Sequence, residues 1–236
     1  MRRCRSALTL VEFLVVFAIV AMVVALLLPF CRSAREPARR NSCMNNLKNI
    51  SLALLRYEEE HGSLPPAYTV DEQGKRLHSW RTLLLPYLEQ SKLFESIDLT
   101  KPWDDPANEK ARNTVVESYQ CPSSPELLGL TNYLGVIGVD CAFAGSVPRE
   151  LSAVKDGPEM TVAVIDVGTD RAVPWMSPQD INEDGVLELV PDAKMNHPGI
   201  MPAAFLDGSV SSISQDIDPT VFRAMLTISG GEDIDY

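Results

Sequence analysis

The sequence predicts an α+β protein in which a long N-terminal helix, transmembrane in its first half, packs on a mainly antiparallel sheet domain with short helices. Three observations predict this fold class. The chain of 236 residues opens on an apolar run, and an amphipathic pattern of helical period follows it. The second half contains short strand-like runs with turn residues between them.

The apolar run from Leu8 to Phe30 predicts the transmembrane half of that helix. Its last 18 residues, Phe13 to Phe30, contain no charged or polar side chain. A helix rises about 1.5 Å per residue and the hydrocarbon core is about 30 Å thick, so roughly 20 residues span it. We expect a membrane anchor rather than a secretory signal peptide, whose apolar core has about 7–15 residues, or a buried core helix.

Charge divides the chain into a basic head and an acidic body. Residues 1–50 carry a formal charge of +6 and the remaining 186 residues carry −17, which together give the net charge of −11. Neutralising phosphates requires clustered Lys and Arg side chains. The acidic body therefore argues against nucleic acid as a partner.

The helix is expected to continue past the apolar run as an amphipathic segment. One apolar stripe recurs at spacings of three and four residues: Leu47, Ile50, Leu54 and Tyr57. Gly62 suits a helix C-cap, and Pro65-Pro66 forbid continuation. The sequence therefore predicts one helix over residues 8–61, bent at Pro29.

Cap residues predict two short helices in the body. Ser79 suits the N-cap of a helix that Pro86 bends or splits. A last helix is predicted over residues 219–227, because Asp218 precedes a proline that suits the first helical position.

Strands are predicted by β-branched and aromatic runs. Three such runs cover residues 133–137, 161–167 and 186–190. The clearest hairpin joins residues 203–206 to residues 209–213, because Asp207-Gly208 suits a type I′ turn. These strands predict a mainly antiparallel sheet.

Arg-Ser-Ala7, followed by Leu8-Thr9-Leu10-Val11-Glu12, stands at the start of the apolar run. This segment resembles the prepilin-type cleavage and methylation signature of type IV pilins and type II secretion pseudopilins. The resemblance implies that prepilin peptidase cuts after Ala7 and that Leu8 becomes the N-methylated first residue. It also implies that Glu12 pairs with the N-terminal amine of a neighbouring pilin-like subunit, since opposite charges attract strongly in a low dielectric.

Nine residues separate His197 from Asp207-Gly208. With earlier blocks in the same order, this spacing resembles the prepilin-type processing-associated H-x(9)-D-G proteins, a family with a domain of unknown function. The blocks include residues 43–48, 79–90, 121–123, 131–135 and 172–175. The resemblance implies a pilin-like fold with these parts: leader 1–7, transmembrane helix 8–30, amphipathic continuation 31–62, globular domain 63–230 and acidic tail 231–236.

His197 and Asp207 are not expected to share a metal ion. If residues 200–206 form a strand, a rise of about 3.3 Å per residue places the two more than about 20 Å apart. We expect Asp207-Gly208 to make the turn, and His197 to order the loop that enters the strand.

Calcium is the one cofactor that the sequence suggests. Asp180-Ile-Asn182-Glu-Asp184-Gly185 matches the first half of an EF-hand loop, in which oxygen ligands alternate before a sharp Gly turn. Position twelve is Pro191 instead of Glu, so Glu188 or Asp192 would have to substitute. A solvated acidic turn is the competing interpretation.

Four cysteines would remain after cleavage: Cys31, Cys43, Cys121 and Cys141. Cys31 and Cys43 are about 18 Å apart along one helix, which is too far for a disulfide. Because Cys43 and Cys121 both fall in the blocks of the resemblance, they are the first pair to test in an oxidising compartment. Cys121 with Cys141 is the alternative pair.

The sequence contains no nucleophile motif, Walker loop or zinc-protease motif, so we do not expect an enzyme. The favoured function is a pseudopilin-like envelope protein, processed by prepilin peptidase and assembled into a pilus or secretion pseudopilus. A monomeric, membrane-anchored extracytoplasmic binding module is the alternative. Either protein would be a single-pass inner-membrane protein with its N-terminus inside and its globular domain in the periplasm or extracytoplasmic space.

Overall fold

The computed structural model describes residues 10–33, 35–124, 129–190 and 193–230, with the backbone alone for residues 24–33. The α-helices are α1 Leu10–Ser33, α2 Arg35–His61, α3 Trp80–Leu83, α4 Ser91–Glu95, α5 Glu109–Arg112, α6 Glu183–Leu187 and α7 Pro219–Leu226. The 3₁₀ helices are η1 Leu85–Leu88, η2 Pro106–Asn108, η3 Glu117–Tyr119, η4 Leu151–Ala153 and η5 Thr169–Arg171. The strands are β1 Tyr68–Val70, β2 Arg76–Ser79, β3 Leu130–Thr131, β4 Tyr133–Ile137, β5 Val162–Asp166, β6 Val173–Pro174, β7 Ile181–Asn182, β8 Ile200–Phe205 and β9 Val210–Ser214.

The chain divides into two compact units, residues 1–39 and residues 40–236, and the boundary falls inside α2. We call the second unit the body. The first unit contains α1, whose apolar side chains are largely exposed from Leu10 to Val23. The sequence predicted one helix over residues 8–61. The structure has α1 and α2 over most of this range, while residues 8, 9 and 34 lie outside the described residues.

The predicted transmembrane helix over residues 8–30 is not supported. In the part of the chain that the structure describes, no helix is long and apolar enough to cross a membrane. A span needs about 20 consecutive apolar residues. The fold class is corrected accordingly to a helix followed by a mostly sheet domain.

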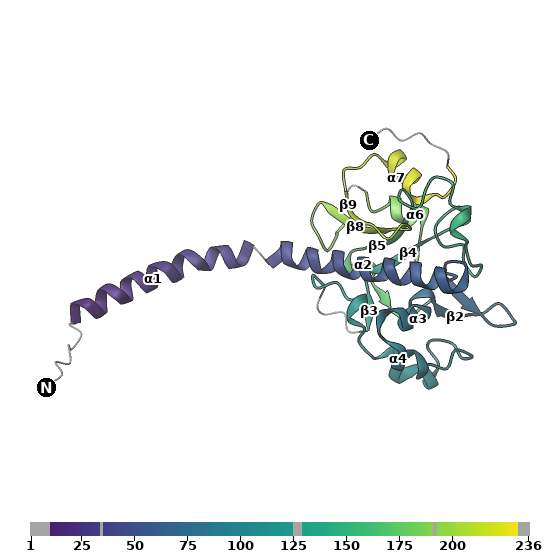
Figure 1. Cartoon of the computed structure of the whole chain (residues 1–236), viewed down its shortest axis with the longest axis horizontal. Coiled ribbons are helices and arrows are strands. Elements are labelled where there is room, and N and C mark those ends of the chain that lie inside the picture. Colours follow the sequence, from purple (N-terminus) through teal and green to yellow (C-terminus); the bar gives the residue numbers. More distant parts are fainter. Residues whose placement is uncertain (1–9, 34, 125–128, 191–192, 231–236) are drawn as a thin grey trace. The chain divides into compact units, whose positions relative to one another are not determined.

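A five-stranded sheet forms the centre of the body, with the order β7-β4-β5-β8-β9 (Figure 1). Only β4 and β7 run parallel, and the other neighbours are antiparallel. Two further pairs, β1 with β2 and β3 with β6, are antiparallel two-stranded sheets. The sheet is therefore mainly antiparallel, as the hairpin and strand signals predicted.

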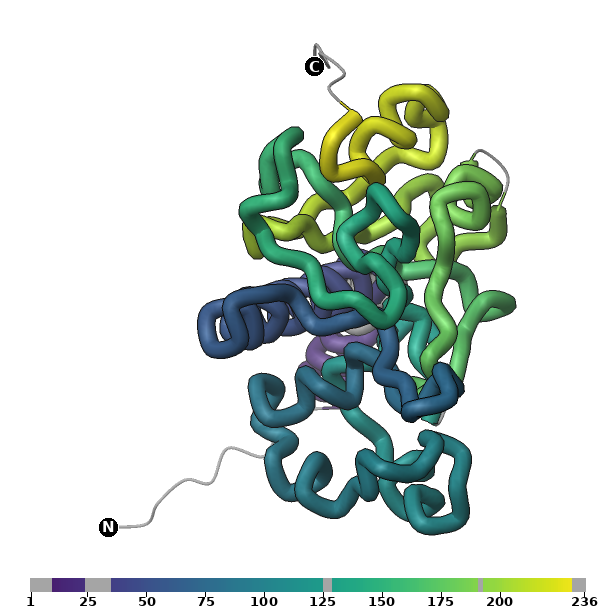
Figure 2. Tube along the Cα trace, turned by 90° about the vertical axis from the view of Figure 1, so that its right-hand side faces the viewer, coloured from purple at the N-terminus to yellow at the C-terminus, as the bar shows by residue number. Residues whose placement is uncertain are grey.

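Two hydrophobic clusters cover the two faces of this sheet. The first contains the buried stripe of α2, including Leu47, Ile50 and Leu54, together with residues of α3, η1 and η3. The second lies under α6 and α7. Within the body, α2 runs between the sheet and the segment that carries α3 and α4 (Figures 1 and 2). Helix α2 is consequently buried from two sides, and residues on its stripe contact both layers.

Several predicted elements are confirmed at their caps. The Ser79 side chain accepts a hydrogen bond from the Arg81 backbone N–H at the start of α3, and Pro86 lies in the first turn of η1, which follows α3 after Leu84. The Asp218 side chain caps α7 in the same way, accepting from the Thr220 N–H. Helix α2 ends at His61, and Gly62 follows with φ +74°.

Two local predictions are wrong. Residues 186–190 do not form a strand, because Asn182 caps helix α6 and Val186 and Leu187 lie inside it. The hairpin turn is not type I′, which requires positive φ at both central residues. Among the described residues, Asp207 keeps a negative φ while Gly208 has φ +89°. The Gly208 N–H donates to the Phe205 carbonyl, as in a type I turn followed by a left-handed glycine.

Candidate functional site

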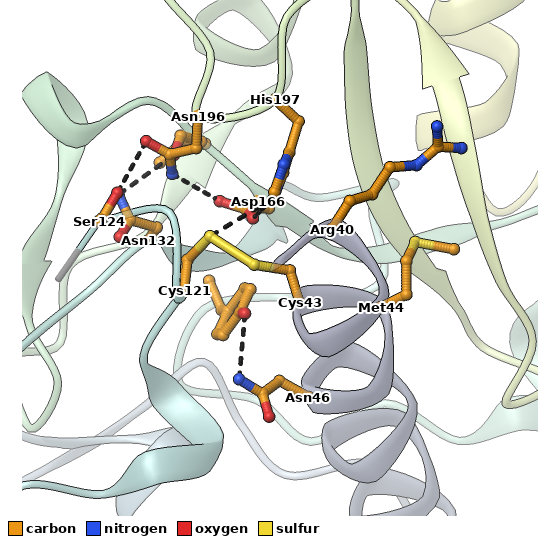
Figure 3. A network of polar contacts seen from close by, with 12 residues as sticks. Arg40, Cys43, Met44, Asn46, Cys121, Ser124, Asn132, Asp166, Asn196 and His197 are labelled. Carbon is orange, nitrogen blue, oxygen red and sulfur yellow. Dashed lines mark hydrogen bonds and ion pairs between the residues drawn. A yellow bond between two sulfur atoms is a disulfide. The ribbon is translucent and has the colours of Figure 1, made fainter. Parts of the chain in front are cut away.

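A buried disulfide joins helix α2 to the loop that follows η3. Cys43 lies on α2, and Cys121 lies two residues after Tyr119, where η3 ends. Their Cα atoms are 5.3 Å apart and both side chains are buried. Figure 3 shows this bond and the polar residues around it. This is the pair that the family blocks favoured, whereas Cys141 is a free buried thiol.

His197 and Asp166 lie beside the disulfide (Figure 3). The His197 Nε2 atom is 3.5 Å from the Cys121 Sγ atom and 3.5 Å from the Asp166 Oδ2 atom. Asp166 ends strand β5, and His197 precedes strand β8. The two side chains are 0% and 2% exposed. We call the four residues the Cys–His–Asp cluster: Cys43, Cys121, Asp166 and His197.

Asn196 holds the Asp166 carboxylate in place. Its side-chain amide donates to the Asp166 Oδ1 atom at 2.9 Å and to the Val167 carbonyl at 2.7 Å. The Asn196 Oδ1 atom accepts from the hydroxyls of Ser124 and Thr169, at 2.8 and 2.9 Å. The Asp166 Oδ2 atom makes no hydrogen bond within the described part of the chain, and it faces His197. One carboxylate oxygen is therefore fixed by amide donors, while the other points into the cluster.

Burial dominates the electrostatics of the cluster. Burial raises the pKa of Asp166 above its usual value, although the nearby His197 imidazole and the Asn196 amide oppose this rise. Burial also raises the pKa of Tyr133 well above its usual value, and the nearby Asp166 adds to the effect. Tyr133 therefore remains a protonated phenol at neutral pH. Its hydroxyl oxygen accepts a 3.4 Å hydrogen bond from the Asn46 side chain on α2.

The donor set of the cluster is suited to a metal ion. Its four potential ligand atoms, two sulfurs, one imidazole nitrogen and one carboxylate oxygen, all lie within 4.8 Å of one another. Thiolate, imidazole and carboxylate are the ligands that zinc takes in proteins. Within the disulfide the two sulfurs are bonded to each other, so only a reduced cluster offers two thiolates.

Comparison with known proteins identifies the family of this chain. A model of DUF1559, described as a protein of unknown function, matches residues 32–162, which is more than half of the chain. The chain belongs to the DUF1559 family. Neither a curated protein nor a solved structure matches it.

The DUF1559 match covers only part of the cluster. Cys43 and Cys121 lie inside the matched residues, whereas Asp166 and His197 lie beyond their end. The cluster was not predicted from the sequence, where Cys43 and Cys121 were expected as a disulfide and His197 as a residue that orders a loop. Asp166 was not singled out at all, and its one signal is a carboxylate at the end of an otherwise apolar strand.

The two ends of the H-x(9)-D-G spacing have different surroundings in this DUF1559 chain. His197 belongs to the cluster, while Asp207-Gly208 forms the β8–β9 turn against α2. The Asp207 Oδ1 atom accepts from the Ser209 N–H at 2.7 Å. The Lys48 ammonium donates to the Gly208 carbonyl at 2.7 Å, and a Cβ at Gly208 would meet the Leu55 Cδ1 atom at 2.9 Å. The turn therefore docks the hairpin on α2.

The residues of the predicted calcium loop do not converge. The Asp180 Oδ1 atom is buried and accepts from Arg81, Trp80 and the Gly135 N–H. Asn182 caps α6 and is committed to the Gly185 N–H. Of the other two candidate ligands, Asp184 is exposed on α6 and Glu188 forms an ion pair with Arg171. Among the described residues Asp180, Asp184 and Glu188 form no potential ligand group, while Asp192, the other candidate ligand, lies outside the described residues.

The buried ion pair of Arg81 with Asp180 was not predicted from the sequence. The Arg81 guanidinium also donates to four backbone carbonyls, those of Tyr133, Trp175, Ser177 and Gln179. A basic residue directly after Trp80 on an apolar helical face was the available signal. The pair connects α3 to the segment before β7 and stays buried.

The processing residues Ala7 and Leu8 lie outside the described residues. Glu12 lies in the first turn of α1 and is the only acidic residue there.

Proposed function

We propose that this DUF1559 chain is a pilin-like structural subunit of an extracytoplasmic assembly. Prepilin peptidase would process it between Ala7 and Leu8, and α1 would pack against α1 of neighbouring subunits. The main support for this proposal is the exposed apolar surface of α1. Large side chains such as Phe13, Phe17 and Met22 are 63%, 64% and 66% exposed.

Exposure of this surface favours association with other apolar helices. Fully burying a side chain such as Phe, Leu or Val contributes about 1.5–3 kcal/mol relative to leaving it exposed. Contiguous apolar surface of this kind marks an interaction site in most proteins. A second copy of the chain offers an identical surface, and the prepilin-like segment before it supports helix-to-helix assembly.

Glu12 gives this assembly a register. A carboxylate in an apolar interface is costly unless it is paired, so its partner fixes the position of the neighbouring helix. We propose that this partner is the amine of the mature N-terminus, Leu8, of the next subunit. The disulfide of the body agrees with an extracytoplasmic place, because disulfides persist in oxidising compartments.

The test compares two acidic residues that each stand in the first turn of a helix, Glu12 in α1 and Glu36 in α2. The full chain is produced with a prepilin peptidase, as wild type, Glu12→Gln and Glu36→Gln. Intact mass reports cleavage and methylation at Leu8, and chemical cross-linking followed by sedimentation reports assembly. We expect wild type and Glu36→Gln to lose residues 1–7 and assemble, and Glu12→Gln to remain unassembled.

A wild-type chain that retains residues 1–7 and remains a monomer would contradict this function. That result would favour the extracytoplasmic binding module instead. Equal assembly of Glu12→Gln and wild type would also contradict the role of Glu12.

A further inference from the structure

The Cys–His–Asp cluster brings together four buried side chains from four separate segments of the chain. We propose that, when the Cys43–Cys121 disulfide is reduced, the cluster binds one zinc ion in a Cys₂-His-Asp site. A covalent bond would then join α2 to the loop after η3 in the oxidised chain, whereas in the reduced chain the metal would join α2 and that loop to Asp166 on the sheet.

The spacing of the cluster agrees with tetrahedral zinc. Zinc bonds to S, N and O atoms are about 2.0–2.3 Å long, which places the ligand atoms of a tetrahedron about 3.3–3.8 Å from one another. The His197 Nε2 atom already lies 3.5 Å from both the Cys121 Sγ atom and the Asp166 Oδ2 atom. The Cα atoms of the two cysteines are 5.3 Å apart, so the freed sulfurs reach such a separation by side-chain rotation.

Asp166 presents the oxygen that the site requires. Its Oδ2 atom is buried, faces the cluster and makes no hydrogen bond within the described residues. The His197 Nε2 atom at 3.5 Å is too distant for a good hydrogen bond to this oxygen, and a metal ion would compensate its burial better. Asn196 meanwhile binds the Oδ1 atom, as outer residues do when they orient a metal ligand.

The donor chemistry selects zinc over calcium or magnesium. Calcium and magnesium prefer oxygen ligands, whereas this cluster offers two sulfurs and one imidazole nitrogen. Two thiolates, one neutral imidazole and one carboxylate carry a charge of −3 in total. A Zn²⁺ ion would offset most of this charge, which would otherwise be buried without compensation.

The change between the two states is a two-electron reduction. A dithiol reductant transfers two electrons and two protons to the disulfide, the S–S bond breaks, and the reductant leaves as its own disulfide. Zinc then replaces the two thiol protons, which pass to solvent, and forms two Zn–S bonds. Oxidation reverses these steps, reforms the S–S bond and releases the ion.

The full chain is tested after reduction with a phosphine and removal of the reductant without air. The probe is Zn²⁺ alone, quantified by elemental analysis and by competition with a chromophoric chelator. We expect one zinc per reduced chain and none on the oxidised chain. The zinc X-ray absorption spectrum should show two sulfur neighbours at about 2.3 Å and two N or O neighbours at about 2.0–2.2 Å.

Two histidine variants locate the site. His197→Ala is expected to weaken zinc binding by at least about tenfold, the lower range for disturbing a metal site. The matched control is His61→Ala, because His61 is exposed at the end of α2 and should leave binding unchanged. The zinc X-ray absorption spectrum of the wild-type chain tests the proposed ligands even if His197→Ala does not fold. The proposal is overturned if reduced wild type binds less than one zinc, if its spectrum lacks sulfur, or if both variants bind equally.

Discussion

The guanidinium of Arg81 lies 2.7 Å from the carboxylate of Asp180 inside the body, and their side chains are 0% and 1% exposed. A buried charge is stable only when it is paired and hydrogen-bonded. Arg81 meets this condition by combining the ion pair with four carbonyl contacts. The pair therefore fixes how α3 and β4 meet the chain around Trp175.

Removing the charge of Arg81 should be strongly destabilising. Arg81→Met leaves Asp180 buried without its partner, and such a change typically costs about 3–5 kcal/mol. The matched control is Arg171→Met, since the Arg171–Glu188 pair is 33% and 67% exposed and contributes about 0–1 kcal/mol. Urea unfolding of both variants measures the difference. Similar losses in the two variants would refute the structural role of the buried pair.

Reduction of the disulfide should destabilise the metal-free body. The bond closes a loop across a sequence separation of 78, and loss of a native disulfide typically costs about 2–5 kcal/mol. Unfolding in urea, with chelator present and with or without reductant, gives this value directly. Cys141→Ala should keep the same response to reductant, because Cys141 is not in the bond. Loss of that response in Cys141→Ala would place the bond elsewhere.

Gly168→Ala should disturb the strand-to-loop packing next to the cluster. A Cβ at Gly168 would clash with the backbone carbonyl oxygen of Lys194, two residues before Asn196. Overpacking of this kind typically costs about 1–3 kcal/mol, and here the obstacle is backbone. At Gly199 nothing lies within 4 Å, although φ is +78°, so Gly199→Ala tests backbone strain alone. Amide hydrogen exchange should show loss of protection around residues 194–197 only in Gly168→Ala.

Stability should depend on the Asp218 cap only when its carboxylate is ionised. A hydrogen bond from the Thr220 backbone N–H lowers the pKa of Asp218 below its usual 3.8. The ionised cap therefore stabilises α7 above about pH 3.8, and this contribution is lost as the pH falls through the lower folded-state pKa.

Melting temperatures of wild type and Asp218→Ala test this dependence. The variant should melt lower at pH 7, and the gap should close in strong acid. Asp216→Ala, at an exposed position before the helix, serves as control and should change little at either pH. A gap that stays constant down to strong acid would rule out the ionised cap.

Helix ends and strand β4 were predicted correctly because neighbouring residues in the sequence determine them. Ser79, Asp218 and Gly62 mark helix ends because their caps involve residues at most four positions away. Strand β4 was predicted over residues 133–137, as observed, because the composition of a short run is also a local signal. The run 186–190 was predicted as a strand because four of its five residues are apolar, whereas the Asn182 cap starts a helix three residues before this run.

The cluster could not be predicted because its residues come from distant parts of the chain. Cys43, Cys121, Asp166 and His197 meet only after α2 packs on the sheet, and no fixed spacing relates them. Arg81 and Asp180 are likewise 99 residues apart in the sequence. The EF-hand spacing is local, and it could not show that the fold buries Asp180 against Arg81.

The central claim is that Cys43 and Cys121 meet beside His197 and Asp166. Peptide mapping without reduction tests it most directly, on full chain isolated with chelator and without reductant and then alkylated. We expect one cross-linked peptide pair that joins Cys43 to Cys121, with Cys141 alkylated. A pair that joins Cys121 to Cys141, or complete alkylation of Cys43 and Cys121, would contradict the claim.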